Sequence, residues 1–148
     1  MPGKVQKISG AVRKKLELAR VGRLATVDAQ GVPHIVPVCF VYQNWVFYTA
    51  IDLKPKRVES SRLARLRHIQ AAPQVALLID KYDDDWSQLW YVLARGKAKL
   101  VPDSAKRERA AAIRRLRAKY PQYAAGMLAD NAILIRITPE RIICWGNI

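Results

Sequence analysis

The fold is decided by the stretch RLATVDAQGVPHIVPVCFVYQNWVFYTA, residues 23–50. It consists of runs of apolar, β-branched and aromatic residues separated by two short polar turns, Gln30-Gly31 and Gln43-Asn44. This pattern predicts three strands. Parallel neighbours need a crossover of roughly a dozen residues, so strands joined by such short turns must be antiparallel. The predicted strands cover residues 23–28, 33–42 and 45–50.

Helices are expected where apolar residues recur every three or four positions between capping and breaking residues. Three segments satisfy this criterion. They are 5–20, ended by Gly22; a helix from Ser60 or Ser61 to about Gln70, stopped by Pro73; and the very basic 104–119, capped by Asp103 and closed by Pro121.

Outside these helices the chain contains more strand-forming runs. Together with the leading strands they predict a mainly β (α+β) domain of about seven strands and three helices, a closed or nearly closed antiparallel barrel. The additional strands are 74–81, 89–101 with Gly96 as a bulge or bend, and a final hairpin of 132–138 and 141–146 around Pro139-Glu140.

Length and composition predict a single domain over residues 1–148. The chain is 51% hydrophobic, which argues against disorder, and no apolar run reaches the roughly 20 residues of a membrane span. Its two cysteines form no CxxC pair, and the N-terminus does not resemble a signal peptide. We therefore expect a cytoplasmic protein with reduced thiols that makes no contact with a membrane.

The chain is strongly basic, with 26 Lys+Arg against 12 Asp+Glu and a formal net charge of +14. This excess favours an anionic ligand such as a phosphate, a polycarboxylate or a nucleic acid. Nucleic acid is the least favoured of the three. The basic residues of 104–119 spread around the predicted helix, and no aromatic residues interleave with them.

No motif for nucleotide, zinc or nucleophilic chemistry is present in the sequence. His34 and His68 are interpreted as surface or packed residues, and the serine pair 60–61 as a helix cap. The acidic run 83–85 is typical of a solvated loop rather than a metal site. We predict no catalytic side chain and no metal ligand. An enzyme with this sequence would depend on a bound redox cofactor.

Three segments are candidates for contact with such a cofactor. Pro37 interrupts a strand-forming run and marks an edge where backbone groups can meet a planar ligand. The run Lys54-Pro-Lys-Arg57 follows a strand end and could grip a phosphate. Trp86 and Trp90 offer flat faces for stacking. The alternatives are a plain edge-strand proline, a solvated basic loop, and core or dimer packing.

Five segments, in their order and spacing, resemble the pyridoxamine 5′-phosphate oxidase-like superfamily, whose fold is a split β-barrel that binds FMN or the deazaflavin coenzyme F420. They are LATV (24–27), GVPHIVPV (31–38), FYTA (47–50), KPKR (54–57) and PQVALLID (73–80). The stretch DDDWSQLW (83–90) is most similar to a small branch expected to use F420, and ITPERIICW (137–145) is similar to the last strands of the superfamily. The resemblance extends over residues 7–146.

The resemblance implies a cofactor site formed by four groups of residues. The ring would lie along Val36, Pro37 and Val38, and the ribityl chain and phosphate would lie near Thr49 and Ala50. The phosphate would be gripped by Lys54 and Lys56, assisted by Arg57. The ring or substrate would be faced by Trp86 and Trp90, in part from the partner subunit.

The resemblance also implies the function, which is an oxidoreductase that uses F420, or alternatively FMN, to transfer a hydride to or from a small organic substrate. The excess of basic over acidic residues favours F420, because its tail of glutamates is negatively charged. A carrier protein that binds the cofactor without turnover stays open as the other class. We further expect a homodimer with two cofactor sites at its interface, because long apolar strand edges invite association.

Overall fold

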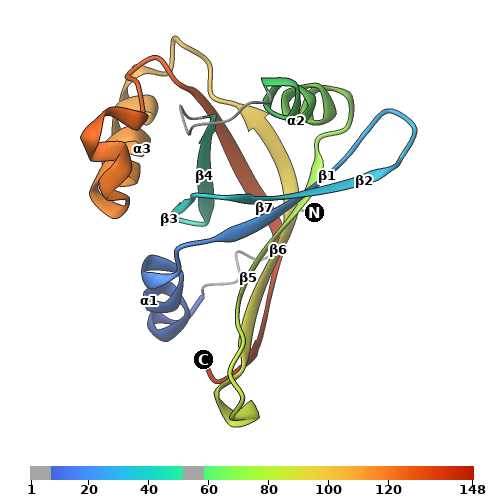
Figure 1. The fold of residues 1–148 in the computed structure, drawn as a ribbon, viewed down its shortest axis with the longest axis vertical. Coiled ribbons are helices and arrows are strands. Elements are labelled where there is room, and N and C mark those ends of the chain that lie inside the picture. Colours follow the sequence, from blue (N-terminus) through green and yellow to red (C-terminus); the bar gives the residue numbers. More distant parts are fainter. Residues whose placement is uncertain (1–7, 52–58) are drawn as a thin grey trace.

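The computed structural model describes residues 8–51 and 59–148, which form one seven-stranded antiparallel sheet (Figure 1). The order of strands across the sheet is β2-β1-β5-β6-β7-β4-β3. The predicted mainly β architecture of a split antiparallel barrel is confirmed. The strands are β1 Gly22–Val27, β2 Pro33–Val38, β3 Val41–Gln43, β4 Val46–Ile51, β5 Gln74–Lys81, β6 Trp90–Leu100 and β7 Ile133–Gly146.

Three α-helices accompany the sheet within the described residues, together with one 3-10 turn and one π-type turn. The α-helices are α1 Gly10–Leu18, α2 Glu59–Ala71 and α3 Lys106–Lys119, and the turns are η1 Trp86–Gln88 and η2 Tyr123–Met127. In Figure 1, α1 and α3 lie on one side of the long strands β5, β6 and β7, and α2 lies near the ends of β1 and β2. None of these helices is long and apolar enough to cross a membrane.

The predicted strand 33–42 is interrupted. It forms β2 and β3, which flank an unpaired step at Cys39 and Phe40. We call this step the split. The turn that follows lies at Asn44–Trp45, one residue later than predicted, and both residues have positive φ. The indole Nε1 of Trp45 donates to the carbonyl of Pro139 at 3.0 Å, which helps to hold this strained backbone in place.

The predicted hairpin at the C-terminus is wrong, because residues 133–146 form the single strand β7. The pairing with β6 runs past Pro139 and shifts register where Arg95 pairs with Arg141 and Gly96 with Pro139, so that Glu140 is the extra, bulged residue. A bulge accommodates a proline within a sheet, and the missing side chain of Gly96 makes room for it. The sequence predicts a bulge or bend at Gly96, and the structure has a bulge there, with the extra residue on β7 opposite Gly96.

Helix ends depart from the prediction in two places. Gly22 does not end α1 but begins β1, since α1 ends at Leu18. Asp103 does not cap α3. The N-cap is Ala105, without a side-chain hydrogen bond, and its N–H donates to the carbonyl of Pro102 at 3.0 Å in the preceding turn. Asp103 lies within that turn, two residues before the N-cap. Capping by Ser60 or Ser61 concerns side chains outside those described.

The core consists of two clusters of buried residues, which lie on opposite faces of β4 and β7 because neighbouring residues of these strands belong to different clusters. The first lies beneath α1, whose Val12 and Leu16 pack on residues of several strands, and the second lies beneath α3. Burial of this apolar surface is the main stabilising contribution. Fully buried members of the first cluster include Leu24, Phe40, Phe47, Leu77, Ile79, Ile135 and Ile137, and those of the second include Leu116, Leu128 and Leu134.

Candidate functional site

The split is closed by hydroxyl groups from two distant parts of the chain. The hydroxyl of Thr49 donates to the carbonyl of Cys39 at 2.7 Å. The N–H of Phe40 donates to the hydroxyl of Tyr120 at 3.0 Å. That hydroxyl in turn faces the carbonyls of Arg20 at 3.0 Å and Phe40 at 3.1 Å. Buried backbone groups must find partners, so these bonds allow the sheet to break here.

Two unpaired strand edges flank the split. β2 is the last strand on one side of the sheet. On the other side, β3 pairs with β4 only as far as Tyr48, so the stretch 49–51 has no strand partner on that side among the described strands. The bond from Thr49 to Cys39 joins these two edges. Unpaired edges offer backbone N–H and C=O groups to a ligand.

The predicted ring-binding residues lie on the β2 edge. Pro37 is exposed, Val36 is half-buried and Val38 is buried. Pro37 pairs with Arg23 of β1, so both point to the outer face of the sheet, whereas Val38 contributes to the core. Pro37 and the backbone on either side of it are therefore the part of this segment that a flat ligand can reach.

Thr49 and Ala50 lie in β4, beside the split, but their side chains are buried, on opposite faces of the strand. Thr49 is 1% exposed and its hydroxyl donates to Cys39, and Ala50 is part of the core beneath α3. A ligand at this edge would meet their backbone rather than their side chains. Lys54, Lys56 and Arg57 follow β4 in the sequence and lie outside the described residues, so the phosphate grip stays a prediction.

The two tryptophans are not brought together. Trp86 is 73% exposed on η1, at the tip of the β5–β6 hairpin, which is the end of the molecule farthest from α2 (Figure 1). Trp90 is 7% exposed and belongs to the core, with the Nζ of Lys15 5.3 Å from the centre of its ring. Of these two tryptophans, Trp86 is the one whose ring is accessible for stacking on a ligand.

The acidic run beside Trp86 is organised by local hydrogen bonds. The N–H of Asp85 donates to Asp83 at 2.9 Å and lowers the pKa of that carboxyl, assisted by Lys81. The hydroxyl and the N–H of Ser87 donate to Asp85 and lower its pKa. These bonds shape the turn at the hairpin tip. Among the described residues, no group of three or more His, Cys, Asp and Glu side chains could hold a metal ion.

The two histidines of the chain lie together, which sequence reasoning missed. Their rings are 4.3 Å apart, since the pairing of Thr26 with His34 places His34 beneath α2, which carries His68. Nδ1 of His68 lies 3.1 Å from the hydroxyl of Thr26, and Nε2 of His34 lies 3.3 Å from Asp28. The N–H of Val32 and then His34 hold the pKa of Asp28 below its usual range. These contacts link α2 to the start of β2 and to the turn before it.

Comparison with known protein families matches residues 8–146 to the family described as pyridoxamine 5′-phosphate oxidase. The chain belongs to this family. The resemblance found in the sequence is thereby confirmed over nearly the same residues. The split with its two unpaired edges is therefore a feature of a pyridoxamine 5′-phosphate oxidase family member.

The chain is similar in sequence to a curated protein of Streptomyces rimosus, a 5a,11a-dehydrotetracycline/5a,11a-dehydrooxytetracycline reductase. The two proteins are 30% identical over 126 residues, which cover 84% of this chain and 73% of the relative.

Solved structures share the fold. The heme storage protein HutZ of Vibrio cholerae superposes with a TM-score of 0.70 at 16% identity, over 95% of both chains. A FAD-binding protein of Mesorhizobium loti superposes with a TM-score of 0.67 at 24% identity, over 93% of this chain and 94% of the other. At these identities the likeness concerns the fold of the family alone.

Proposed function

We propose that this chain is an oxidoreductase that binds coenzyme F420, or alternatively FMN, and transfers a hydride to or from a small organic substrate. The observation that carries the proposal is the 30% identity to a reductase over 84% of this chain, within the pyridoxamine 5′-phosphate oxidase family. The net charge of +14 favours F420, because its glutamate tail is anionic.

The edges that flank the split fit a flat cofactor. Pro37 is exposed on the unpaired edge of β2, where a ring could lie, and the backbone of Thr49 and Ala50 has no strand partner on the β3 side of β4. When bound, the cofactor supplies the hydride. In this proposal the chain itself orients donor and acceptor and shields them from water, with Lys54, Lys56 and Arg57 on the phosphate.

The proposal is tested by the absorption and fluorescence of the purified protein during separate titrations with F420, FMN and hemin. We expect saturable binding of F420 or FMN, followed by oxidation of the reduced cofactor when acceptors with activated C=C bonds are added. Saturable binding without turnover of any acceptor would favour a carrier. Binding of hemin alone would favour pigment storage, a second candidate suggested by the likeness to HutZ.

The phosphate grip gives a prediction of its own. Replacing Lys54 or Lys56 by alanine should weaken cofactor binding roughly ten- to a hundredfold, because each would remove a charge-assisted hydrogen bond of about 1.5–3 kcal/mol. The measurement is the same spectral titration. The matched control replaces Arg107 and Arg114, two exposed residues of α3, by alanine. These substitutions should change the affinity for the cofactor weakly and only at low salt. Equal losses from both sets would assign the effect to general charge.

We also propose a homodimer formed through the outer face of the long strands. Leu78, Leu93 and Ile143 pair across β5, β6 and β7, next to the stacked rings of Tyr91 and Trp145 at 5.6 Å. These residues alternate with core residues, and in Figure 1 the helix α1 lies on the other side of these strands. An apolar face of this kind is typical of an interface.

Sedimentation at about 10 µM should give the mass of a dimer for the unchanged chain. Leu93→Glu should give a monomer, because it buries a carboxylate in the proposed interface. Lys99→Glu, on the same strand and face, is the matched control and should stay dimeric. A monomeric unchanged chain at this concentration would contradict the proposal.

A further inference from the structure

We propose that the cleft between α1 and α3 binds an amphipathic organic anion, a carboxylate on an apolar body, at a site that adjoins the split but is distinct from the proposed cofactor edges of β2 and β4. Both helices contact β3, which forms the floor of the cleft. The cleft consists of two cavities of about 500 Å³ and about 540 Å³ that share Glu17, Tyr42 and Arg115. Each volume lies in the range of small-molecule sites.

Most of the charged side chains that line the cleft are positive. Among the residues that the structure describes, the lining has one carboxylate, Glu17, against five cations. None of the ion pairs formed by the residues that the structure describes includes Arg13, Lys14 or Arg115. Uncompensated cations in a concave surface attract an anion and bind it through charge-assisted hydrogen bonds. The five cations are Arg13, Lys14, Arg20, Arg115 and Lys119.

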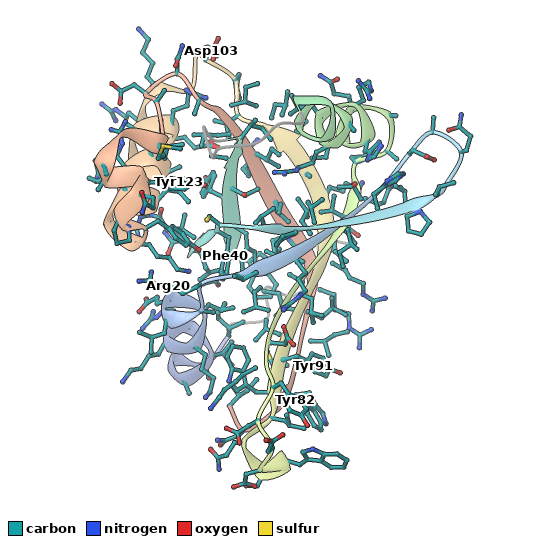
Figure 2. All side chains as sticks on the ribbon, in the orientation of Figure 1. Arg20, Phe40, Tyr82, Tyr91, Asp103 and Tyr123 are labelled. Atoms are coloured by element: carbon teal, nitrogen blue, oxygen red, sulfur yellow. The ribbon has the colours of Figure 1, made fainter. Side chains whose placement is uncertain are left out.

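Two of the cations are held in place by the fold. Arg20 donates to the carbonyl of Lys119 at 2.5 Å, and the Nζ of Lys119 donates to the carbonyl of Leu16 at 3.0 Å. Figure 2 shows Arg20 between α1 and α3, with Phe40 on the side toward the sheet. Burial, and then the nearby Arg20, lower the pKa of Lys119 to about 8. An anion in the cleft would offset this unfavourable environment.

The rest of the lining is apolar or a hydrogen-bond donor. Leu18 is 68% exposed, and with Val41 and Ala118 it forms an apolar strip. The hydroxyl of Tyr42 accepts from the N–H of Trp45 at 3.1 Å. Burial raises the pKa of Tyr42, so the hydroxyl keeps its proton and can donate to a ligand. Inorganic phosphate or a nucleic-acid backbone would leave the strip uncovered, whereas an apolar body would cover it.

The test uses the fluorescent anion 8-anilinonaphthalene-1-sulfonate as the probe, with the full chain in about 0.15 M salt, where exposed charges are screened beyond roughly 8 Å. We expect saturable binding of the probe and its displacement by decanoate. Decanol, pyrophosphate and a single-stranded oligonucleotide should displace it at least tenfold less well, and saturating F420 or FMN should not displace it.

Two variants and a control assign the binding to the cleft. Arg115→Ala should weaken decanoate roughly tenfold or more, because it removes a charge-assisted bond from an exposed side chain. Leu18→Asn should weaken it several-fold by removing apolar surface. Arg107→Ala, on α3 but outside the cleft, should leave decanoate affinity within twofold. Circular dichroism checks that each variant is folded.

The opposite results overturn the proposal. Equal losses in the Arg115 and Arg107 variants would mean general electrostatic attraction. Displacement by the oligonucleotide or pyrophosphate but not by decanoate would mean a polyanion site. Displacement by the cofactor would make the cleft part of the cofactor site. Absence of saturable binding to the unchanged chain would mean that there is no such site.

Discussion

Gly96→Ala is expected to lower the free energy of unfolding by about 3 kcal/mol, because the added methyl group has nowhere to go. A Cβ at this position would overlap the carbonyl oxygen of Thr138 and lie 2.7 Å from the Cα of Pro139. Both contacts are backbone, so relief requires β7 to move away from β6 at the bulge. These two strands share the longest pairing in the sheet, from Trp90 to Leu100.

The measurement is urea unfolding followed by circular dichroism, and the midpoint of thermal unfolding should fall by roughly 6–12 °C. Gly10→Ala is the matched control, since a Cβ there meets nothing within 4 Å and the residue begins α1. That variant should be as stable as the unchanged chain or slightly more so. A Gly96→Ala variant within about 0.5 kcal/mol of the unchanged chain would show that the bulge adapts without strain.

Tyr120→Phe should be nearly as damaging, although the ring is retained. The hydroxyl bonds the N–H of Phe40 at the split and faces the carbonyls of Arg20 and Phe40. Each buried backbone group left without a partner costs about 1–3 kcal/mol, so we expect a loss of about 2–4 kcal/mol in the free energy of unfolding. Burial raises the pKa of Tyr120 to about 12, so the hydroxyl is protonated throughout the neutral range.

Two measurements separate this role from simple packing. Urea unfolding gives the loss of stability, and amide hydrogen exchange should become faster at Phe40, whose N–H loses its acceptor. Tyr82→Phe is the matched control, since Tyr82 is exposed near the hairpin tip (Figure 2), and it should change stability by less than about 0.5 kcal/mol. Unchanged exchange at Phe40 would mean that the hydroxyl does not hold the split closed.

These two positions also separate what sequence could predict from what it could not. The strands of 23–50 are antiparallel because their turns are too short for anything else, and this is a local property of the chain. Gly96 was recognisable as the site of a bulge or bend because an isolated glycine inside a strand often marks one. The family was recognisable because its motifs keep their order over residues 8–146.

The site depended on contacts between distant residues. Pro37 marks an edge in the apolar run 33–42, but it does not fix the position of the break, which lies at Cys39 and Phe40 because Tyr120 and Thr49 bind the backbone there. For the same reason Thr49, expected beside the cofactor, turns its hydroxyl inward.

The sequence by itself determined a basic, antiparallel β protein, because turns, periodicity and charge are properties of neighbouring residues, and the order of its motifs identified the pyridoxamine 5′-phosphate oxidase family. Only the tertiary structure decided that β7 passes straight through Pro139, since the space it needs is left by Gly96 on another strand. It also decided the contact of His34 with His68 and the cleft between α1 and α3. The physical reason is the same in each case. These features depend on tertiary contacts between backbone and side-chain groups that are distant in the sequence, and local propensity carries no information about such contacts.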